Sequence, residues 1–361
     1  MKFSKRVERF CKRCILNILK MFLKPVPVQP EEFDAESISK ILVIRQDSRL
    51  GNLVLMTPLI RGLKTAFPDA ELDVLISEGY EEVLSHNPYI DHTIVFEKRK
   101  ARLLPWLYPL FIKRLRRTEY DIAIDVSNGY HFSLNNMLLT SLSGADYRIG
   151  YNRNDAQAFL NLLIQLPPPD MHMADAMLGL VKYISPDAHE FPTAFFLNDE
   201  DCSFADEWLK SHGITELDSF FVIHPGGKGK KRWNEKNFAG LIGRINADIG
   251  LKIVVIGGIA EHDTLNKIRD LSKGSFEALE NVTVGQMAAI IDRSNLFISG
   301  DTGPIHISSA LGRPTIGIFI SSDFRVYGPR GENARIVIGR QDQTSIKDVM
   351  IAVMDLFSNG V

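Results

Sequence analysis

The stretch that decides the fold is Ile298-Ser-Gly-Asp-Thr-Gly-Pro-Ile-His-Ile-Ser-Ser-Ala-Leu-Gly-Arg-Pro-Thr-Ile-Gly-Ile-Phe319. It predicts a strand end, a tight turn, one short helix and the next buried strand. Asp301 or Thr302 can cap this helix, because a short side-chain oxygen accepts hydrogen bonds from N–H groups at a helix start. Pro304 suits the first turn, where its missing N–H costs nothing. Gly312 suits the left-handed position just after the last turn.

The start of this helix predicts an anion site. It follows the carboxyl end of a strand, and Gly303 lets the backbone approach a ligand closely. His306 falls in the first turn, on the side where the ligand would bind. The sequence therefore indicates a phosphate-binding site, and the other loops decide what the phosphate belongs to.

Composition favours an ordinary soluble protein of two domains. The chain has 361 residues, of which 45% are hydrophobic and 24% charged, enough for two separate cores. A net charge of -2 gives no overall attraction to nucleic acid. Cys11, Cys14 and Cys202 cannot build a disulfide framework, which fits a reducing compartment. Cys11 and Cys14 form a lone CxxC, and we interpret them as helix-surface cysteines rather than as a zinc site, which needs four ligands.

The first 24 residues predict a basic amphipathic helix. Apolar side chains fall on one helical face and Lys and Arg on the others. Lys20 interrupts the apolar run, which is well short of the ~20 residues that a membrane span requires. No small-residue cleavage site follows, which argues against a signal peptide. Such a helix lies on an anionic membrane surface or packs against the protein itself, and residues 25–30, rich in proline, predict a stiff linker.

From Lys40 onward, strands and helices alternate in two similar halves. The apolar runs predict strands at 41–44, 71–76, 92–96 and 120–125, and again at 220–224, 251–256 and 296–299. Helices are expected at 237–247, 286–292 and 344–357. This alternation predicts parallel sheets covered by helices, with a ligand cleft at the carboxyl ends of the strands. We expect a bridge around 165–200 and the following divisions: 1–35 N-terminal helix and linker, 36–190 first domain, 191–343 second domain, and 344–361 C-terminal helix.

Three loops follow strand ends and project toward the expected cleft: residues 45–52, residues 224–233, and the opening motif. In the second loop, Gly226 and Gly227 free the backbone to approach a ligand, and Lys231 supplies positive charge. The alternative is a solvated surface loop. Trp233 is predicted to be a packing anchor.

Beyond the next strand, Glu261 can accept hydrogen bonds from a ribose, or it can sit in the first turn of a helix as an ordinary carboxylate. No G-x-G-x-x-G is present in the sequence. This absence argues against a dinucleotide-binding dehydrogenase.

Taken in this order, the loops resemble the ADP-heptose:lipopolysaccharide heptosyltransferase family. The shared pattern is Arg-x-Asp-x-x-x-Gly-Asn/Asp, then His-Pro-Gly with Lys-x-Trp, then Asp-Thr-Gly-Pro-x-His-x-x-x-Ala-Leu-Gly-x-Pro. The similarity runs from about Ile41 to Gly328. It implies the GT-B fold, with two Rossmann-like domains facing a cleft, the acceptor on the first and the nucleotide sugar on the second. It also implies inverting transfer without a metal.

The resemblance assigns roles to particular residues. Arg45 and Arg49 fall on the acceptor side. Lys231 and the helix start at Thr302 would stabilise the negative charge that grows on the departing ADP. The donor contacts fall on Gly226, Gly227, Lys231, Glu261, Asp301, Thr302, Gly303 and His306.

The sequence departs from the family at the presumed general base. The family has an Asp after the glycine of the first loop, and this chain has Asn52. An amide cannot accept the proton of the acceptor hydroxyl, and general-base catalysis is worth roughly 10²–10⁴-fold. Asp47 in the same loop is the candidate replacement; it could instead hold Arg49 or cap the turn. Asn52 itself could cap the next helix or orient the acceptor.

Residues 98–117 place Lys and Arg on both sides of an apolar, aromatic centre. This composition suits anionic lipid head groups or a phosphorylated glycolipid. The alternative is a helix with a core-facing apolar side and a solvated basic face.

We therefore expect a glycosyltransferase that moves a heptose from ADP-heptose to a lipopolysaccharide-core or related surface-glycan acceptor. It would invert the anomeric carbon and need no metal or other cofactor. We expect it in the cytoplasm, peripheral on the inner face of the cytoplasmic membrane, with no nucleic-acid partner. The alternatives are a family member with another nucleotide sugar or acceptor, and a catalytically silent sugar-nucleotide binding protein, suggested by Asn52.

Overall fold

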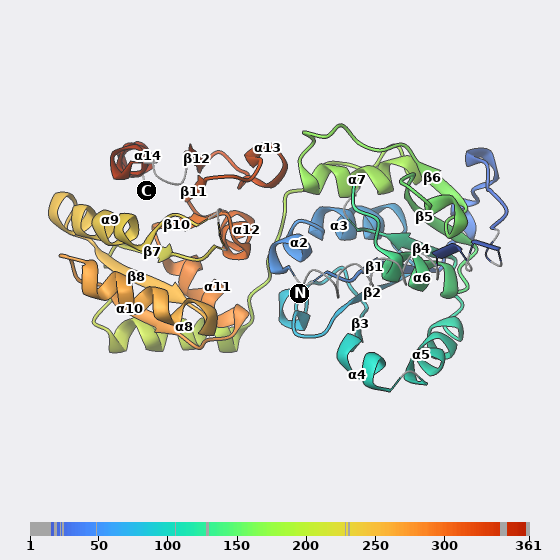
Figure 1. Cartoon of the computed structure of the whole chain (residues 1–361), viewed down its shortest axis with the longest axis horizontal. Coiled ribbons are helices and arrows are strands. Elements are labelled where there is room, and N and C mark those ends of the chain that lie inside the picture. The colour runs from blue at the N-terminus through green and yellow to red at the C-terminus, as the bar shows by residue number, and fades with distance from the viewer. Residues whose placement is uncertain are drawn as a thin grey trace.

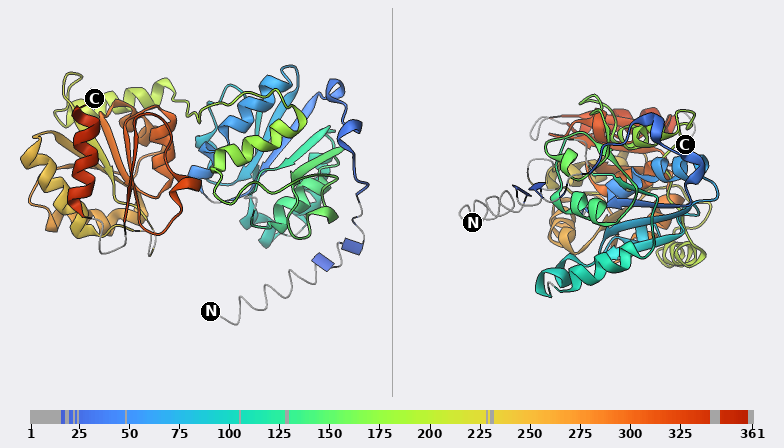
Figure 2. Two further views of the ribbon diagram at one scale, coloured as in Figure 1. Left: turned by 90° about the horizontal axis from the view of Figure 1, so that it is seen from above. Right: turned by 90° about the vertical axis from the view of Figure 1, so that its right-hand side faces the viewer.

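The computed structural model describes residues 16–17, 20–21, 23, 25–47, 49–104, 106–127, 130–227, 229, 232–339 and 345–358. The chain forms two α/β domains that lie side by side along its longest axis (Figures 1 and 2). This arrangement confirms the predicted fold class of two Rossmann-like domains with parallel sheets.

The first domain is built on a parallel six-stranded sheet in the order β3-β2-β1-β4-β5-β6. Its strands are mostly buried apolar runs, as expected for a sheet covered on both faces. They are β1 (Lys40–Arg45), β2 (Glu71–Ser77), β3 (His92–Phe96), β4 (Ile122–Asp125), β5 (Tyr147–Tyr151) and β6 (Leu162–Ile164). The α-helices are α2 (Leu50–Val54), α3 (Thr57–Ala66), α4 (Lys98–Leu103), α5 (Leu107–Arg116), α6 (Leu134–Leu142) and α7 (Met173–Ile184). Short 3₁₀ turns are η1 (Pro30–Glu32), η2 (Ala35–Ser37), η3 (Glu81–Val83) and η4 (Ala156–Ala158).

The second domain repeats this plan in the order β12-β11-β10-β7-β8-β9. The strands are β7 (Phe220–His224), β8 (Lys252–Gly257), β9 (Glu277–Glu280), β10 (Leu296–Gly300), β11 (Thr315–Phe319) and β12 (Ala334–Ile338). The helices are α8 (Asp199–Ser211), α9 (Glu235–Asp248), η6 (Ile259–Glu261), α10 (His262–Leu271), α11 (Val284–Arg293), α12 (Gly303–Ala310), α13 (Phe324–Tyr327) and α14 (Ile346–Ser358). Val349 and Val353 of α14 lie in the core of this domain, which also contains Phe238 of α9.

Each sheet reverses its strand order at one point. The reversal falls between β1 and β4 in the first domain and between β7 and β10 in the second. In open α/β sheets, ligands bind outside the carboxyl ends of the strands at this switch point. The three loops singled out from the sequence follow β1, β7 and β10. The topology therefore gathers them at the two switch points.

All the strands expected from the apolar runs are present, but the expected bridge is wrong in extent. The structure places helix α7 inside residues 165–200, where its apolar residues Met177, Leu178 and Val181 are buried in the core. The chain crosses between domains in the shorter extended segment that links α7 to α8, and α8 belongs with the second sheet (Figure 1). The proline run at 167–169 had concealed the helix that follows it.

Most of the basic N-terminal helix, including Cys11 and Cys14, lies outside the described residues. Of the part described, Leu16 and Leu23 pack against a small core cluster that contains Phe159, and Lys20 pairs with Asp155. This end of the segment therefore rests on the protein's own first domain. Among the described residues, no helix has the length and apolar character needed to cross a membrane.

Candidate functional site at the domain boundary

Helix α12 starts at the switch point of the second sheet. Thr302 is its N-cap residue, but the Thr302 side chain makes no capping hydrogen bond. Its hydroxyl lies instead 3.0 Å from Ser299 Oγ and 3.2 Å from His224 Nδ1. The Asp301 carboxylate accepts a hydrogen bond from the Ser322 hydroxyl. The expectation of a Thr302 side-chain cap is therefore wrong, and its oxygen is not what satisfies the first N–H groups, the groups that bind anions at helix starts.

The starts of α12 and α2 meet between the domains. A Cβ atom built at Gly51 would lie 2.4 Å from His306 Cδ2, and one built at Gly303 would lie 2.9 Å from Leu50 Cδ2. Such separations are too short for real carbon atoms. The buried His306 ring makes glycine necessary at Gly51, whereas a side chain at Gly303 would have to displace Leu50. This close approach brings His306, from the second domain, beside the loop that follows β1.

His306 is buried at this contact, and burial lowers its pKa to about 4. The nearby Asp301 carboxylate opposes this shift, and His172 adds to it. At neutral pH the imidazole is therefore uncharged, with one nitrogen able to donate and the other able to accept.

The glycines of the second loop are explained by His224, the last residue of β7. Burial lowers the pKa of His224 to about 4, and its Nδ1 accepts a hydrogen bond of 3.3 Å from the Gly226 N–H. A Cβ atom at Gly226 would lie 2.1 Å from His224 Cε1, and Gly227 has φ +137°. Both glycines are thus required by the path of the loop itself.

The rest of this loop divides into unlike parts. Lys231 lies outside the described residues, so its predicted role is untested. Arg232 points toward α10 and α9, where it donates to the Thr264 hydroxyl and lies 3.5 Å from the Glu235 carboxylate. Trp233 is fully buried and packs edge-on against Phe238, with 4.9 Å between the ring centroids. This confirms that Trp233 is a packing anchor.

Glu261 has a local structural role. Its carboxylate Oε2 accepts a hydrogen bond of 3.2 Å from the Gly258 N–H at the start of η6. This is the helix-turn arrangement that the sequence left open as the alternative. Its other oxygen is not involved in that bond, and the ribose contact stays a prediction.

In the first loop, Asp47 and Asn52 are bonded to each other. Asp47 Oδ2 accepts from Asn52 Nδ2 at 2.6 Å and from Arg45 Nη2 at 2.8 Å. Arg45 is buried and also donates to the Val126 carbonyl. Asn52 is the third residue of α2, so the interpretation of Asn52 as a helix cap is wrong.

Asp47 is held by Arg45 and not by Arg49, whose backbone is the N-cap of α2. Two fixed donors hold one oxygen of the Asp47 carboxylate. Its second oxygen, Oδ1, is buried and has no hydrogen-bond partner, so the 32% exposure of the side chain belongs to its other atoms. The arrangement leaves a carboxylate oxygen oriented but unused.

The sequence analysis missed a buried polar cluster at the end of β4. Asp125 is fully buried and pairs with Arg153, which follows β5. Asp125 Oδ1 also accepts from the Ser127 hydroxyl at 2.7 Å and from Asn136 Nδ2 at 3.3 Å. The available signal was an Asp ending an apolar strand at the switch point. Its partner is distant in sequence, so only the fold identifies the pair.

Lys98 is a second missed residue beside Asp47. It is the first residue of α4, and its Nζ donates to the Gln46 carbonyl at 2.9 Å. Burial lowers the pKa of Lys98, while the Asp47 and Glu78 carboxylates act in the opposite direction. The basic segment that begins at Lys98 therefore reaches the first loop through this side chain.

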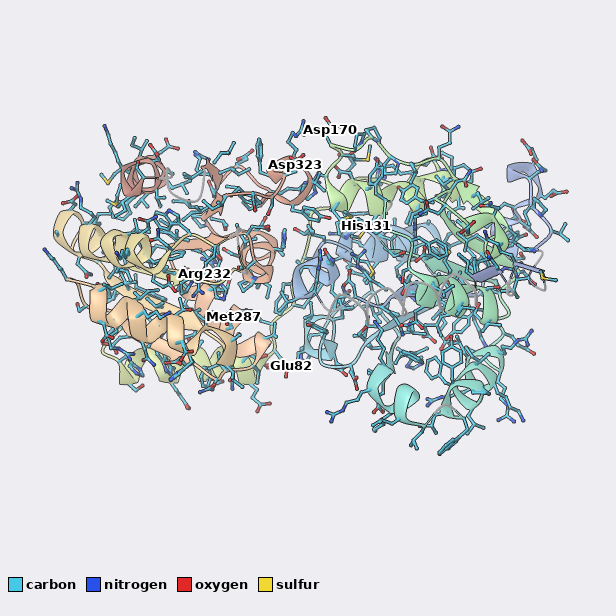
Figure 3. The ribbon with its side chains drawn as sticks, in the orientation of Figure 1. Glu82, His131, Asp170, Arg232, Met287 and Asp323 are labelled. Atoms are coloured by element: carbon cyan, nitrogen blue, oxygen red, sulfur yellow. The ribbon has the colours of Figure 1, made fainter. Side chains whose placement is uncertain are left out.

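Contacts on both sides of the site join the two domains. Arg330 pairs with Asp175, and His172 Nε2 lies 3.0 Å from the Gly328 carbonyl. On the opposite side, Glu82 accepts from the Val284 N–H at 2.9 Å. Figure 3 labels Glu82 at this boundary, and Asp170 and Asp323 at its other end. Exposed ion pairs each contribute little free energy. The buried contact between α2 and α12 therefore does most to fix the position of one domain relative to the other.

Two facing Rossmann-like domains, each with its polar loops at the switch point, are the arrangement of the GT-B fold. The family model for glycosyltransferase family 9 (heptosyltransferase) matches residues 110–355. The chain belongs to this family.

Known relatives are similar along most of their length. Lipopolysaccharide heptosyltransferase 3 of Escherichia coli is 25% identical over 297 residues, covering 78% of this chain and 84% of the relative. Lipopolysaccharide heptosyltransferase 1 of Escherichia coli K12 is 22% identical over 310 residues, covering 82% and 92%.

Solved structures share the fold. A family 9 glycosyl transferase from Veillonella parvula superposes with a TM-score of 0.80 at 21% identity, covering 89% of this chain and 98% of that one. Escherichia coli heptosyltransferase WaaC, solved with ADP-2-deoxy-2-fluoro heptose, has a TM-score of 0.70 at 19% identity, covering 88% and 99%.

Proposed function

We propose that this transferase moves a heptose from ADP-heptose to a lipopolysaccharide-core or related surface-glycan acceptor, with inversion and without a metal. The observation that carries the proposal is the α12 start, whose Thr302 side chain forms no capping bond. It lies against the first loop through the Gly51–His306 contact. A diphosphate at this helix start would put the anomeric carbon beside the first loop, where the acceptor hydroxyl must enter.

The donor side offers neutral hydrogen-bonding groups for a dianionic ligand. Backbone N–H groups at the α12 start and in the Gly226–Gly227 loop would serve the phosphates, and Lys231 would add positive charge. These groups would stabilise the charge that develops on ADP as it leaves. Membership of the family and the ADP-sugar bound by WaaC support ADP-heptose as the donor.

Asp47 is the proposed general base. Arg45 and Asn52 hold its Oδ2. Oδ1 is buried without a partner in this structure, so the first loop would have to shift for Oδ1 to accept the proton of the acceptor hydroxyl. The hydroxyl oxygen would then attack the anomeric carbon from the face opposite the diphosphate. In this reading Asn52 orients the base and does not replace it.

The acceptor follows from the names of the relatives. Lipopolysaccharide heptosyltransferases 1 and 3 match most of this chain, which supports a lipopolysaccharide-core or related glycan. The expectation that no cofactor takes part also stays a prediction.

The test is release of ADP from ADP-heptose in the presence of a heptose-deficient core acceptor, with UDP-sugars as the donor control. We expect ADP release only with the ADP-sugar and acceptor together, and a new heptose on the product by mass spectrometry. Release that is equally fast with UDP-sugars would contradict the proposed donor.

A second candidate, a catalytically silent nucleotide-sugar binding protein, is suggested by Asn52. The Asn52→Asp variant separates the two. In the native chain Asn52 Nδ2 lies 2.6 Å from Asp47 Oδ2. If Asp47 is the base, a second carboxylate at this position would share a proton with Asp47, remove the hydrogen bond that orients it, and lower turnover. Undetectable native turnover that appears in Asn52→Asp would favour the silent protein.

We also propose that the first domain rests on the cytoplasmic face of an anionic membrane through α4 and α5. Leu103 of α4, Trp106 at the N-cap of α5 and Leu110 of α5 are 69%, 62% and 59% exposed. Exposed basic residues of α5 accompany them: Lys113, Arg114 and Arg116. These helices lie at the lower edge of the first domain in Figure 1. Apolar side chains among basic ones suit an anionic bilayer surface.

Sedimentation with liposomes of anionic and of neutral lipids tests this surface. Trp106→Glu with Leu110→Glu should reduce binding to anionic liposomes severalfold. Leu217→Glu is the matched control, because Leu217 is 97% exposed on the second domain. Unchanged binding in the α5 variant would remove the membrane role from these helices.

A further inference from the structure

Three potential metal ligands share one face of the first sheet, at the amino ends of β2 and β3. Glu71 and Asp73 are two residues apart on β2, so their side chains point to the same face. His92, the first residue of β3, is the direct cross-strand partner of Asp73. The backbone alone therefore brings two carboxylates and one imidazole together. Among the described residues this is the one group of three such side chains with ligand atoms within 4.8 Å of one another.

Asp73 is unusual among them because it is buried, at 4% exposure. Its Oδ2 accepts a hydrogen bond from the Tyr120 hydroxyl, while its Oδ1 has no hydrogen-bond partner. Burial raises the pKa of Asp73, opposed by the Tyr120 hydrogen bond and reinforced by the Glu71 charge. A buried carboxylate oxygen without a partner costs free energy unless a proton or a cation compensates it.

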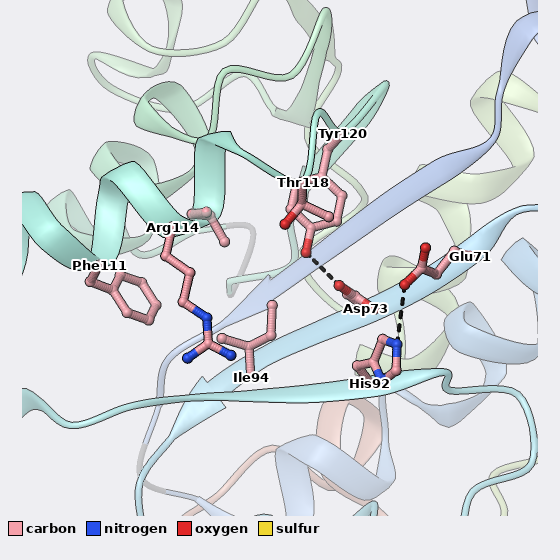
Figure 4. Close-up of a pocket in the computed structure, with 9 residues that line it drawn as sticks. Glu71, Asp73, His92, Ile94, Phe111, Arg114, Thr118 and Tyr120 are labelled. Carbon is pink, nitrogen blue, oxygen red and sulfur yellow. Dashed lines mark hydrogen bonds and ion pairs between the residues drawn. The ribbon is translucent and has the colours of Figure 1, made fainter.

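The distance between two of the three ligand atoms matches the edge of a tetrahedral zinc site. His92 Nε2 lies 3.2 Å from Glu71 Oε1, and ligands at zinc bond lengths on adjacent corners of a tetrahedron are about 3.3–3.5 Å apart. A pocket joins the three residues to α5 and to the chain before β4, and Figure 4 shows them around it. Its other lining residues are Ile94, Phe111, Arg114, Leu115, Thr118 and Tyr120.

We propose that Glu71, Asp73 and His92 bind a divalent transition-metal ion of the zinc type, with water as the fourth ligand. One imidazole nitrogen with two carboxylate oxygens is a ligand set that zinc accepts, whereas Mg²⁺ requires octahedral oxygen coordination. The two carboxylates carry negative charge that a divalent ion would neutralise, in a pocket that Arg114 also lines. Tyr120 orients the buried ligand from outside, as outer hydrogen bonds commonly do at metal sites.

The position of the site indicates a structural role. Glu71 and His92 begin their strands, so the site lies at the edge of the sheet opposite the switch point. An ion there would fasten the edge strand β3 to β2, beneath α5. It would take no part in transfer, and the prediction of a metal-free reaction is unaffected.

The test is Zn²⁺ titration of the full-length chain after chelator treatment, followed by calorimetry and thermal unfolding. Cys11, Cys14 and Cys202 are first changed to Ser, so that no thiol contributes. We expect one Zn²⁺ per chain and a higher Tm in its presence. His92→Gln and Asp73→Asn should each weaken binding at least about tenfold and remove the rise in Tm.

The matched control is His262→Gln. His262 also pairs with a carboxylate, Glu280, at 2.6 Å, but no third ligand among the described residues accompanies them, so zinc affinity should be unchanged. The His92 side chain is 68% exposed, so His92→Gln should leave the fold intact. If Asp73→Asn misfolds, the zinc affinity of His92→Gln is the test of the proposal. No zinc binding in the cysteine-free chain, or equal affinity in His92→Gln, would overturn the proposal and leave Asp73 compensated by a proton.

Discussion

The two switch points of this enzyme have the same topology but different chemistry. At the end of β1 and β4, the polar groups are ion pairs: Arg45 with Asp47, and Arg153 with Asp125. At the end of β7 and β10, the described buried groups are mostly uncharged: the imidazoles of His224 and His306 and the glycine backbone. The Asp301 carboxylate also lies there and accepts a hydrogen bond from the Ser322 hydroxyl. One fold thus provides buried ion pairs on one side and mainly neutral buried groups on the other.

The difference fits the proposed role of each side. A proposed general base must be held in one orientation, and the Arg45 and Asn52 side chains hold the Asp47 carboxylate. A diphosphate would bring its own charge, and N–H groups at a helix start would bind it. Two switch points of the same topology thus differ in chemistry because of a few side chains at the strand ends.

The largest expected effect is on turnover in Asp47→Asn. The amide cannot accept the acceptor proton, so kcat should fall by about 10²–10⁴-fold. The Kd for ADP should change little, since the donor is proposed to bind the second domain. Steady-state rates and calorimetry of ADP binding measure the two quantities. Equal losses in both would mean that Asp47 is a structural residue, and no loss in either would exclude it as the base.

Breaking the second ion pair should affect stability. Arg153→Met leaves the buried Asp125 carboxylate without its cation and should lower the free energy of unfolding by about 3–5 kcal/mol. Adding Asp125→Asn to the same chain should recover much of this loss, because no charge is then buried. Urea unfolding measures both. A single variant within about 1 kcal/mol of the native protein would show that Ser127 and Asn136 suffice for Asp125.

The neutral histidines predict a loss of stability in mild acid. His172, His224 and His306 each have a folded pKa of about 4, below the unfolded value of about 6.5. The unfolded chain therefore takes up protons first, and stability falls as pH decreases from about 6.5 to 4, by up to about 3 kcal/mol for each histidine.

In His306→Asn, the fall in the free energy of unfolding between about pH 6.5 and 4 should be smaller by the contribution of His306, up to about 3 kcal/mol. Urea unfolding of native and variant protein at several pH values, without ligand, gives the comparison. Parallel curves for the two proteins would mean that His306 is not a neutral buried group.

The smallest expected effect is Gly226→Ala. The added methyl group would collide with the His224 ring and displace the loop N–H groups, so ADP should bind roughly tenfold more weakly, a loss of about 1.4 kcal/mol. Gly243→Ala is the control, because a Cβ atom there meets no atom within 4 Å in the interior of α9. It should leave ADP affinity unchanged and stabilise the helix slightly. Equal ADP affinity in both variants would contradict the required glycine.

The sequence was most informative where the signal is local. Apolar runs predicted β1, β7 and β10 within a residue, because a buried parallel strand needs continuous apolar side chains. Glycine and proline spacing placed α12 and its start. The proline run at 167–169 misled the same reasoning, because proline can precede a helix as well as end one, and α7 begins soon after it.

Sequence reasoning failed where a role depends on a distant partner. Asn52 was interpreted by its position in a motif, yet its role in the structure is its bond to Asp47. Asp125 looked like an ordinary strand end until the fold placed Arg153 beside it. The pattern of residues near each position carried no sign of either contact.

By itself, then, the sequence determined the two α/β halves, the three loops at strand ends and the family, because each depends on residues close together along the chain. Tertiary structure alone decided which side chains meet. It joined Glu71, Asp73 and His92 through the pairing of β2 with β3, and His306 with Gly51 through the docking of the two domains. Burial is a property of the assembled molecule, and burial decides which carboxylates are held by cations and which histidines stay neutral.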